Sequence, residues 1–186
     1  MPGAAWFPGT TVNNVQQVLR QATAGHPVLI AVAEDAHPVE ISWASLPGQV
    51  GAMAPTLRRL GVGPRDHLLN VPEAVIAFLG AAAVGAVWSS CAPDLGTRAV
   101  LDRSRQIEPT VLVAVDGYRF NGKDHDRRAV VAELRAALPI VRTTIAVPRL
   151  FADDVPDGTH SWAEAVADEQ EPAVAELPFE HPLWIL

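Results

Sequence analysis

Short apolar runs alternate with amphipathic segments along most of the chain. The apolar runs predict strands, because they are bounded by turn residues and rich in Val, Ile, Leu and Ala. They cover residues 27–33, 39–43, 67–69, 86–91, 111–115, 143–147 and 183–186. The amphipathic segments predict helices, because their apolar positions recur at spacings of three and four. They cover residues 11–22, 43–60, 73–85, 94–106, 124–138 and 161–167.

This alternation favours right-handed crossovers between parallel strands, with helices packed on both faces of the sheet. The predicted fold class is therefore α/β, with an open, mostly parallel sheet. Helix 73–85 is apolar on nearly every face, which predicts a helix buried between layers. Strands 27–33 and 39–43 are expected to form a hairpin-like pair. The predicted organisation is an N-terminal helical segment (1–25), an α/β core (26–149), an acidic irregular segment (150–180) and the start of another strand (181–186).

Capping residues and prolines mark the predicted helix boundaries. Serine, threonine, asparagine and aspartate at a helix start accept hydrogen bonds from free backbone N–H groups. The predicted caps are Thr10 or Thr11, Ser45, Asn70 and Asp94. Pro47 is expected in the first turn of its helix, where a missing N–H is tolerated, whereas Pro55 is expected to kink the same helix at a cost of about 3 kcal/mol.

Composition limits the class of protein further. The chain has 186 residues, of which 49% are hydrophobic, so it is expected to fold around a core. Cys91 is the only cysteine, which excludes an internal disulfide and favours the reducing cytoplasm. The longest apolar run, 74–88, is shorter than the ~20 residues that a membrane span needs, so no membrane partner is expected.

Charge is distributed unevenly along the chain. The net charge is −7, and residues 150–186 carry nine acidic and no basic side chains. The first 149 residues carry 14 basic and 12 acidic side chains, without the clustered stripe of Lys and Arg that binds nucleic acid. Nucleic acid is therefore not an expected partner.

The segment 117–123, between a predicted strand and the helix predicted from Asp124, is the first candidate site. Arg119 and Lys123 place two cations beside glycines and a helix start, so a phosphate group is a suitable ligand. Lys123 is the only lysine of the chain. A solvated loop with incidental charges is the alternative interpretation, because short basic loops are common.

The turn 88–96 is the second candidate, and it too joins a predicted strand to a helix. Its serines suggest a nucleophile, but the chain has no G-x-S-x-G elbow and no identifiable histidine partner, so capping and packing are favoured. Cys91 is expected to be a small buried residue. The six histidines show no metal-ligand spacing, and Asp153, Asp154 and Asp157 lack the remaining features of a calcium loop, so no metal ligand is assigned.

Several longer motifs carry a family resemblance over nearly the whole chain. They are Trp6-Phe7-Pro8-Gly9, Asn70-Val71-Pro72-Glu73-Ala74-Val75, Gly85-Ala86-Val87-Trp88-Ser89-Ser90-Cys91, Ile107-Glu108-Pro109, Val115-Asp116-Gly117-Tyr118-Arg119 and His181-Pro182-Leu183-Trp184-Ile185-Leu186. With these motifs the chain resembles the acetoacetyl-CoA synthetases, a branch of the adenylate-forming acyl-CoA synthetases. The resemblance identifies the sheet as the incomplete N-terminal part of such an enzyme's large domain.

The resemblance implies a reaction and a ligand site. Members of this family join acetoacetate to CoA through an acyl-adenylate, using ATP and Mg²⁺. In the family the loop matching Arg119 and Lys123 lies where CoA phosphates bind, and the turn matching Ala92, Pro93 and Gly96 lies near CoA. Asn121 stands where the family usually has a glycine. The resemblance assigns no catalytic residue within this chain.

The departures from the family pattern lead to a second interpretation. The chain stops before the family's Ser/Thr/Gly-rich loop for ATP phosphates, and its strand at 67–69 is shorter than the family's. A portion of this kind is expected to be inactive alone and to bind CoA at most. The alternative is a non-catalytic CoA-binding or assembly module, whose sheet edge pairs with another chain or with a complementary chain that completes the domain. A flavodoxin-like nucleotide binder is disfavoured because no G-x-G-x-x-G is present.

Overall fold

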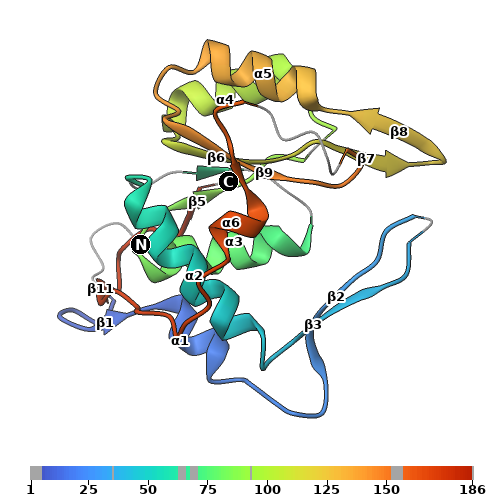
Figure 1. The fold of residues 1–186 in the computed structure, drawn as a ribbon. Helices are drawn as coiled ribbons and strands as arrows, with labels where there is room; N and C mark the ends of the chain where they lie inside the picture. Colours follow the sequence, from blue (N-terminus) through green and yellow to red (C-terminus); the bar gives the residue numbers. More distant parts are fainter. Residues whose placement is uncertain are drawn as a thin grey trace.

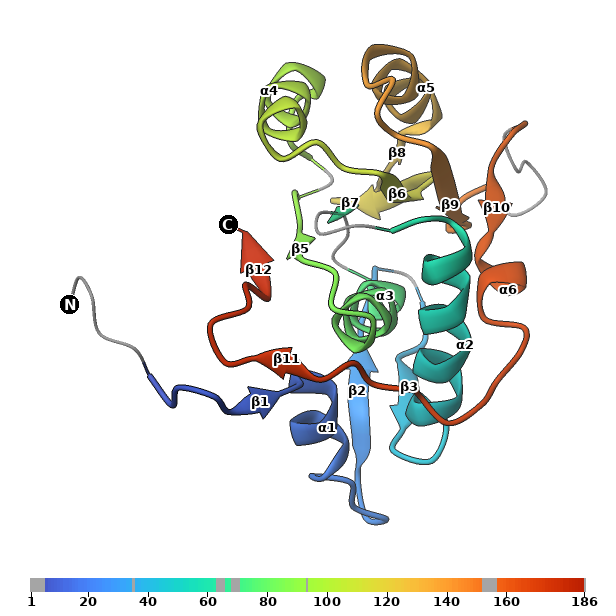
Figure 2. The same cartoon turned by 90° about the vertical axis from the view of Figure 1, so that its left-hand side faces the viewer.

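A parallel sheet between two layers of helices forms the centre of the molecule (Figures 1 and 2). The computed structural model describes residues 6–34, 36–62, 66–67, 71–92, 94–151 and 157–185. The strand order is β10-β9-β6-β4-β5-β12, and every pairing is parallel. The strands are β4 (Asp66–His67), β5 (Trp88–Ser89), β6 (Val111–Val115), β9 (Thr143–Val147), β10 (His160–Ser161) and β12 (Trp184–Ile185). The predicted α/β class is confirmed.

Two pairs of helices cover the two faces of this sheet. Helices α2 (Leu46–Arg59) and α3 (Pro72–Ala83) lie on one face, and α4 (Thr97–Ile107) and α5 (Arg128–Ala137) lie on the other (Figure 2). Helix α3 is buried along most of its length, as its sequence predicts. A Cβ atom at Gly80 would lie 2.5 Å from Cγ of Met53, so the missing side chain permits close packing of α2 and α3.

The N-terminal helix is shorter than predicted and begins at a different cap. Helix α1 spans Asn14–Leu19, and Asn13 caps it by accepting the N–H of Val15 at 3.0 Å. Thr10 and Thr11 are therefore not the caps: Thr11 lies in β1 (Thr11–Val12), which pairs with β11 (Leu177–Pro178). The buried Asn13 amide also donates to the carbonyl of Ala82, at 2.8 Å, and so attaches this segment to α3.

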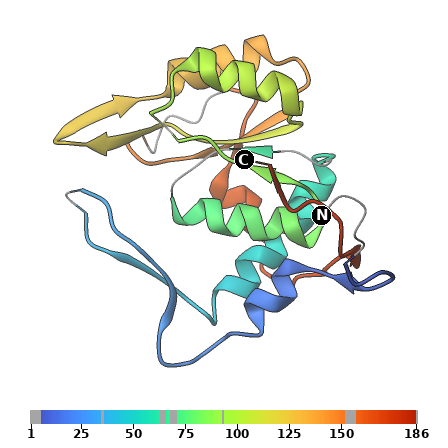
Figure 3. The ribbon, with the colours of Figure 1, turned by 180° about the vertical axis from the view of Figure 1, so that it is seen from behind.

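Two antiparallel hairpins project from the layers on the same side (Figures 1 and 3). The first, β2 (Pro27–Ala31) with β3 (Val39–Ser42), confirms the predicted pair. The second, β7 (Gly117–Phe120) with β8 (Lys123–Asp126), replaces the predicted loop. The helix predicted from Asp124 instead begins at Arg128. The prediction was wrong because Asn121 and Gly122, with φ of 52° and 71°, form a two-residue turn that returns the chain as a strand.

Other predicted helix boundaries are partly correct. Pro47 lies in the first turn of α2, and the helix continues through Pro55 to Arg59. Ser45 occupies the N-cap position of α2, but its hydroxyl bonds to Ser42 and does not cap the helix. The N-cap of α4 is Gly96 and not Asp94, and the predicted cap Asn70 lies outside the described residues.

The last helix agrees with the sequence pattern, and the central strand β4 overlaps the predicted strand 67–69 in part. Helix α6 (Trp162–Ala165) begins with a capping box in which Ser161 and Glu164 exchange hydrogen bonds, and these bonds lower the pKa of Glu164. Strand β4 contributes only Asp66–His67 between its two neighbours, whereas residues 68 and 69 of the predicted strand lie outside the described part. No helix among the described residues is long and apolar enough to cross a membrane.

Candidate functional site

The carboxyl ends of the parallel strands meet at one edge of the sheet, where ligands bind in open α/β folds. Among the segments that leave the sheet at this edge are the turn after β5, the hairpin β7–β8 after β6, and residues 148–151 after β9. The first two contain the site residues predicted from the sequence. Nη2 of Arg127, which follows β8, lies 3.4 Å from the carbonyl oxygen of Leu95 in the turn. The turn after β5 and the base of the hairpin are therefore neighbours.

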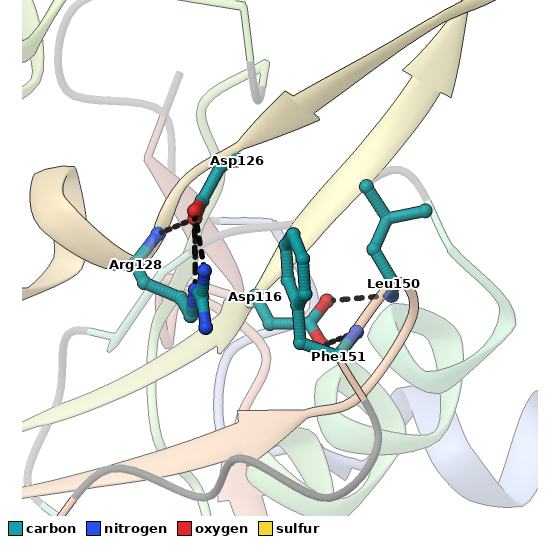
Figure 4. Close-up of polar contacts among 5 residues, drawn as sticks. All are labelled: Asp116, Asp126, Arg128, Leu150 and Phe151. Atoms are coloured by element: carbon teal, nitrogen blue, oxygen red, sulfur yellow. Dashed lines mark hydrogen bonds and ion pairs between the residues drawn. The ribbon is translucent and has the colours of Figure 1, made fainter.

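Asp116 anchors the hairpin to the end of β9. Its carboxylate accepts the backbone N–H groups of Arg149, Leu150 and Phe151 at 2.9, 3.0 and 2.8 Å. Figure 4 shows the last two of these bonds. Its own carbonyl accepts the N–H of Arg127 at 2.8 Å. Asp116 is only 8% exposed, so these bonds are shielded from water. Asp116 thus joins the start of the hairpin to the segment after β9 through its carboxylate, and to the end of the hairpin through its backbone carbonyl.

Charged and aromatic side chains stiffen the base of the same hairpin. Asp126 and Arg128 form a bidentate ion pair, with Nη2 to Oδ2 at 2.7 Å, and the hydrogen bonds from Arg128 lower the pKa of Asp126. The guanidinium of Arg128 lies 3.8 Å from the centre of the Phe151 ring (Figure 4). The rings of Tyr118 and His125 stack across the two strands, with their centroids 4.9 Å apart. The hairpin is therefore held by contacts along its length.

The predicted cations Arg119 and Lys123 lie near the tip of the hairpin, one on each strand. Arg119 faces Asp124 across the strands, with Nε to Oδ1 at 2.7 Å and Nη2 to Oδ2 at 3.2 Å. Both side chains of this ion pair are about half exposed. The Arg119 guanidinium is therefore accessible to a ligand in solvent. Lys123 is also exposed. Of the two predicted cations, Arg119 is therefore held in one orientation by its ion pair with Asp124.

The backbone at the tip forms an anion-binding nest that the sequence analysis missed. Consecutive left-handed residues, Asn121 and Gly122, point their N–H groups in one direction. These groups donate to the two carboxylate oxygens of Glu34 at 2.8 and 2.9 Å. The two bonds lower the pKa of Glu34, with a smaller contribution from Arg119. The dipeptide Asn121-Gly122 is a recognised turn signal, but nothing in the sequence connects it to Glu34 in the β2–β3 connection.

The turn after β5 contains the remaining predicted site residues. Ala92 and Gly96 are exposed, and Pro93 lies outside the described residues. Cys91 is buried, and burial raises the pKa of its thiol, so it packs as a small apolar residue as predicted. Ser89 is fully buried, and its hydroxyl has no hydrogen-bond partner in the described part of the chain, which excludes a solvent-facing nucleophile at that position.

A narrow pocket at the base of the hairpin also borders this edge, and its lining includes Val115, Asp116 and Val147. Within the described ranges, no group of three or more His, Cys, Asp or Glu residues could hold a metal ion. A cavity of about 370 Å³ lies between the C-terminal half of α5 and the start of β9, lined in part by Arg135 and Arg142. Because it adjoins the amino end of β9, it does not border the hairpin tip.

Comparison with known proteins identifies the class to which this fold and site belong. The family model for AMP-binding enzymes matches residues 18–186, so the chain belongs to the AMP-binding enzyme family. The acetoacetyl-coenzyme A synthetase of Rhizobium meliloti is 37% identical, covering all of this chain and 30% of the relative. The mouse acetoacetyl-CoA synthetase is 31% identical over 97% of this chain and 29% of the relative.

A solved structure is similar in fold as well as in sequence. The acetoacetyl-CoA synthetase from Streptomyces lividans superposes with a TM-score of 0.93 and is 50% identical, covering all of this chain and 30% of that one. The family resemblance predicted from the motifs is confirmed by these matches. The chain spans about 30% of the length of the relatives it matches.

Proposed function

We propose that this chain supplies the CoA-binding edge of a cytoplasmic acyl-CoA synthetase that ligates acetoacetate to CoA, with ATP, through an acyl-adenylate. The family match supports the class of reaction, and the names of several similar relatives support acetoacetate as the acyl group. A malonamoyl-CoA synthetase of Penicillium aethiopicum is 28% identical, so the acyl group varies among relatives while CoA is common to their names.

The observation that carries this proposal is the concentration of phosphate-binding groups on one hairpin. Arg119, Lys123 and the amides of Asn121 and Gly122 lie within five consecutive residues at the carboxyl edge of the sheet. Guanidinium, ammonium and paired backbone N–H groups are the donors that proteins use for phosphates. The exposed residues Ala92 and Gly96, on the turn next to the hairpin base, are proposed to border CoA.

The groups needed for ATP and Mg²⁺ chemistry are not assigned to this chain. No described cluster of acidic residues or histidines fits a magnesium ion, and the sequence holds a single lysine. Adenylyl transfer needs several cations and donors around a polyphosphate. We therefore propose that the 186-residue chain has no ligase activity by itself.

Thermal unfolding with two ligands tests the CoA proposal. A ligand that binds only the native state raises the midpoint of unfolding, and an excess of 100 times Kd stabilises by about 2.7 kcal/mol. For a chain of this size that corresponds to a rise of about 5–10 °C. We expect CoA to produce this rise and pantetheine, which lacks the phosphates, to produce none. Equal shifts, or no shift with CoA, would refute phosphate recognition by the hairpin.

A second candidate function is a non-catalytic module that binds CoA and assembles with another chain. It is favoured by β12, an edge strand of the sheet whose Trp184 is 45% exposed. Light scattering of the purified chain, together with an assay of pyrophosphate release, separates the two candidates. A stable complex with a partner that restores no ligase activity would favour the module.

A further inference from the structure

The contact between Glu34 and the tip of the β7–β8 hairpin joins two segments that are far apart in the sequence. Glu34 lies just after β2, and the amides it binds lie 87 and 88 residues further along the chain. The ends of the two hairpins lie side by side in Figures 1 and 3. Each carboxylate oxygen accepts one N–H, at 2.8 Å from Asn121 and 2.9 Å from Gly122. The carboxylate is therefore held by both donors of the nest.

The geometry is that of an anion in a binding site. Two adjacent N–H groups on left-handed residues form a concave donor pair, which in proteins receives phosphates and other oxyanions. A carboxylate and a phosphate both offer two oxygens at a spacing that such a pair accepts. Glu34 thus occupies the donors that an external oxyanion would use.

The charges at the tip show what Glu34 does to this site. Arg119 and Lys123 contribute two positive charges, and Asp124 and Glu34 contribute two negative charges. The local charge is therefore balanced while Glu34 is in place. Removing its carboxylate would leave a net positive charge and two N–H donors exposed to solvent, which together favour an incoming anion.

We propose that Glu34 is an internal competitor for the anion site at the hairpin tip, so that a phosphate-bearing ligand binds by displacing it and releasing the β2–β3 hairpin. The competition concerns any oxyanion. The identification of the physiological ligand as the phosphates of CoA rests on the proposed function. A ligand can bind at the tip only in molecules from which Glu34 is released. Its apparent affinity is therefore the intrinsic affinity multiplied by the fraction of such molecules. The contact thus couples occupancy of the site to the position of a second hairpin.

Pyrophosphate and CoA, titrated separately, test the competition. Amide resonances of Asn121 and Gly122 report occupancy of the nest, and Glu34→Ala and Glu34→Gln are compared with the native chain. Glu40→Gln is the matched control, since Glu40 is an exposed glutamate on β3 of the same hairpin. A contact formed in about nine molecules of ten would weaken binding about tenfold. We therefore expect Glu34→Ala to bind pyrophosphate about tenfold more tightly, and Glu40→Gln to bind it as the native chain does.

The possible results separate this inference from the CoA proposal. Tighter pyrophosphate binding by Glu34→Ala supports the competition, and an absence of CoA binding in the same samples would then refute only the CoA proposal. If pyrophosphate and CoA each bind the native and Glu34→Ala chains with equal strength, the competition is overturned and a CoA site is left standing. No binding of either ligand to any variant overturns both. Because Glu34 is exposed, its replacement is not expected to affect folding, which circular dichroism checks.

Discussion

The carboxylate of Asp116 accepts the backbone N–H of Phe151 at 2.8 Å, which joins the end of β6 to the segment that follows β9. Two further N–H groups, from Arg149 and Leu150, converge on the same carboxylate. The candidate hairpin begins at the next residue, Gly117. The position of the proposed phosphate-binding groups therefore depends on this buried acceptor.

Replacing Asp116 with alanine is expected to destabilise the fold. The substitution leaves three partly buried N–H groups without their acceptor, and hydrogen bonds to charged groups contribute about 1.5–3 kcal/mol each. We expect urea unfolding to show a loss of at least about 3 kcal/mol. The control Asp102→Ala removes an exposed carboxylate that forms an ion pair with Arg105, with Nη1 to Oδ1 at 3.6 Å. It should change the free energy of unfolding by less than about 0.5 kcal/mol. Equal effects of the two variants would contradict the anchoring role.

Replacing Gly117 with alanine is expected to distort the start of the hairpin. A Cβ atom there would lie 2.7 Å from the carbonyl oxygen of His125 and 2.9 Å from Cδ1 of Leu150. Overpacking of this kind costs about 1–3 kcal/mol. Gly25→Ala is the control, because nothing lies within 4 Å of a Cβ atom at that position. Thermal unfolding of the two variants gives the comparison, and a stable Gly117→Ala chain would show that β7 shifts freely.

Position 121 is expected to tolerate glycine and to reject β-branched residues. Asn121 has a φ of 52°, a conformation that asparagine and glycine adopt readily and that costs other residues about 1–2 kcal/mol. We expect Asn121→Gly to retain the native Gly122 amide resonance, and Asn121→Val to lose stability and shift that resonance. A native spectrum for Asn121→Val would argue against the left-handed turn.

The Cys91 thiol is expected to be nearly inert in the folded chain. Burial raises its pKa, so the reactive thiolate is scarce and the sulfur is shielded. We expect labelling with Ellman's reagent at pH 8 to be much slower in the native chain than in urea. Because the unfolded thiol loses its proton at lower pH than the folded one, stability should decline as the pH rises past the ordinary thiol pKa. Rapid native labelling would place Cys91 at the surface.

Much of the fold is predictable from periodicity because the sheet is buried on both faces. The strands at 111–115 and 143–147 lie where the apolar runs predict them. The hairpin β7–β8 was missed because its strands are polar and exposed, so no burial pattern marks them. The turn signal Asn121-Gly122 alone distinguishes this segment from a loop.

The candidate site is less predictable than the fold. The charges of Arg119 and Lys123 are visible in the sequence, but the pairing of Arg119 with Asp124 depends on strand register. The contact of Glu34 with Asn121 and Gly122 depends on how two distant hairpins lie in space. Asparagine at position 121 is compatible with the turn, since asparagine tolerates the positive φ found there.

The affinity of CoA for native and Arg119→Ala chains, measured by calorimetry, tests the central claim most directly. Arg20→Ala is the matched control, because Arg20 is an exposed arginine at the end of α1. Since a hydrogen-bonded charge contributes about 1.5–3 kcal/mol, the account predicts binding to be at least about tenfold weaker in Arg119→Ala and unchanged in Arg20→Ala. Equal affinity in all three chains, or no binding of CoA by the native chain, would contradict it.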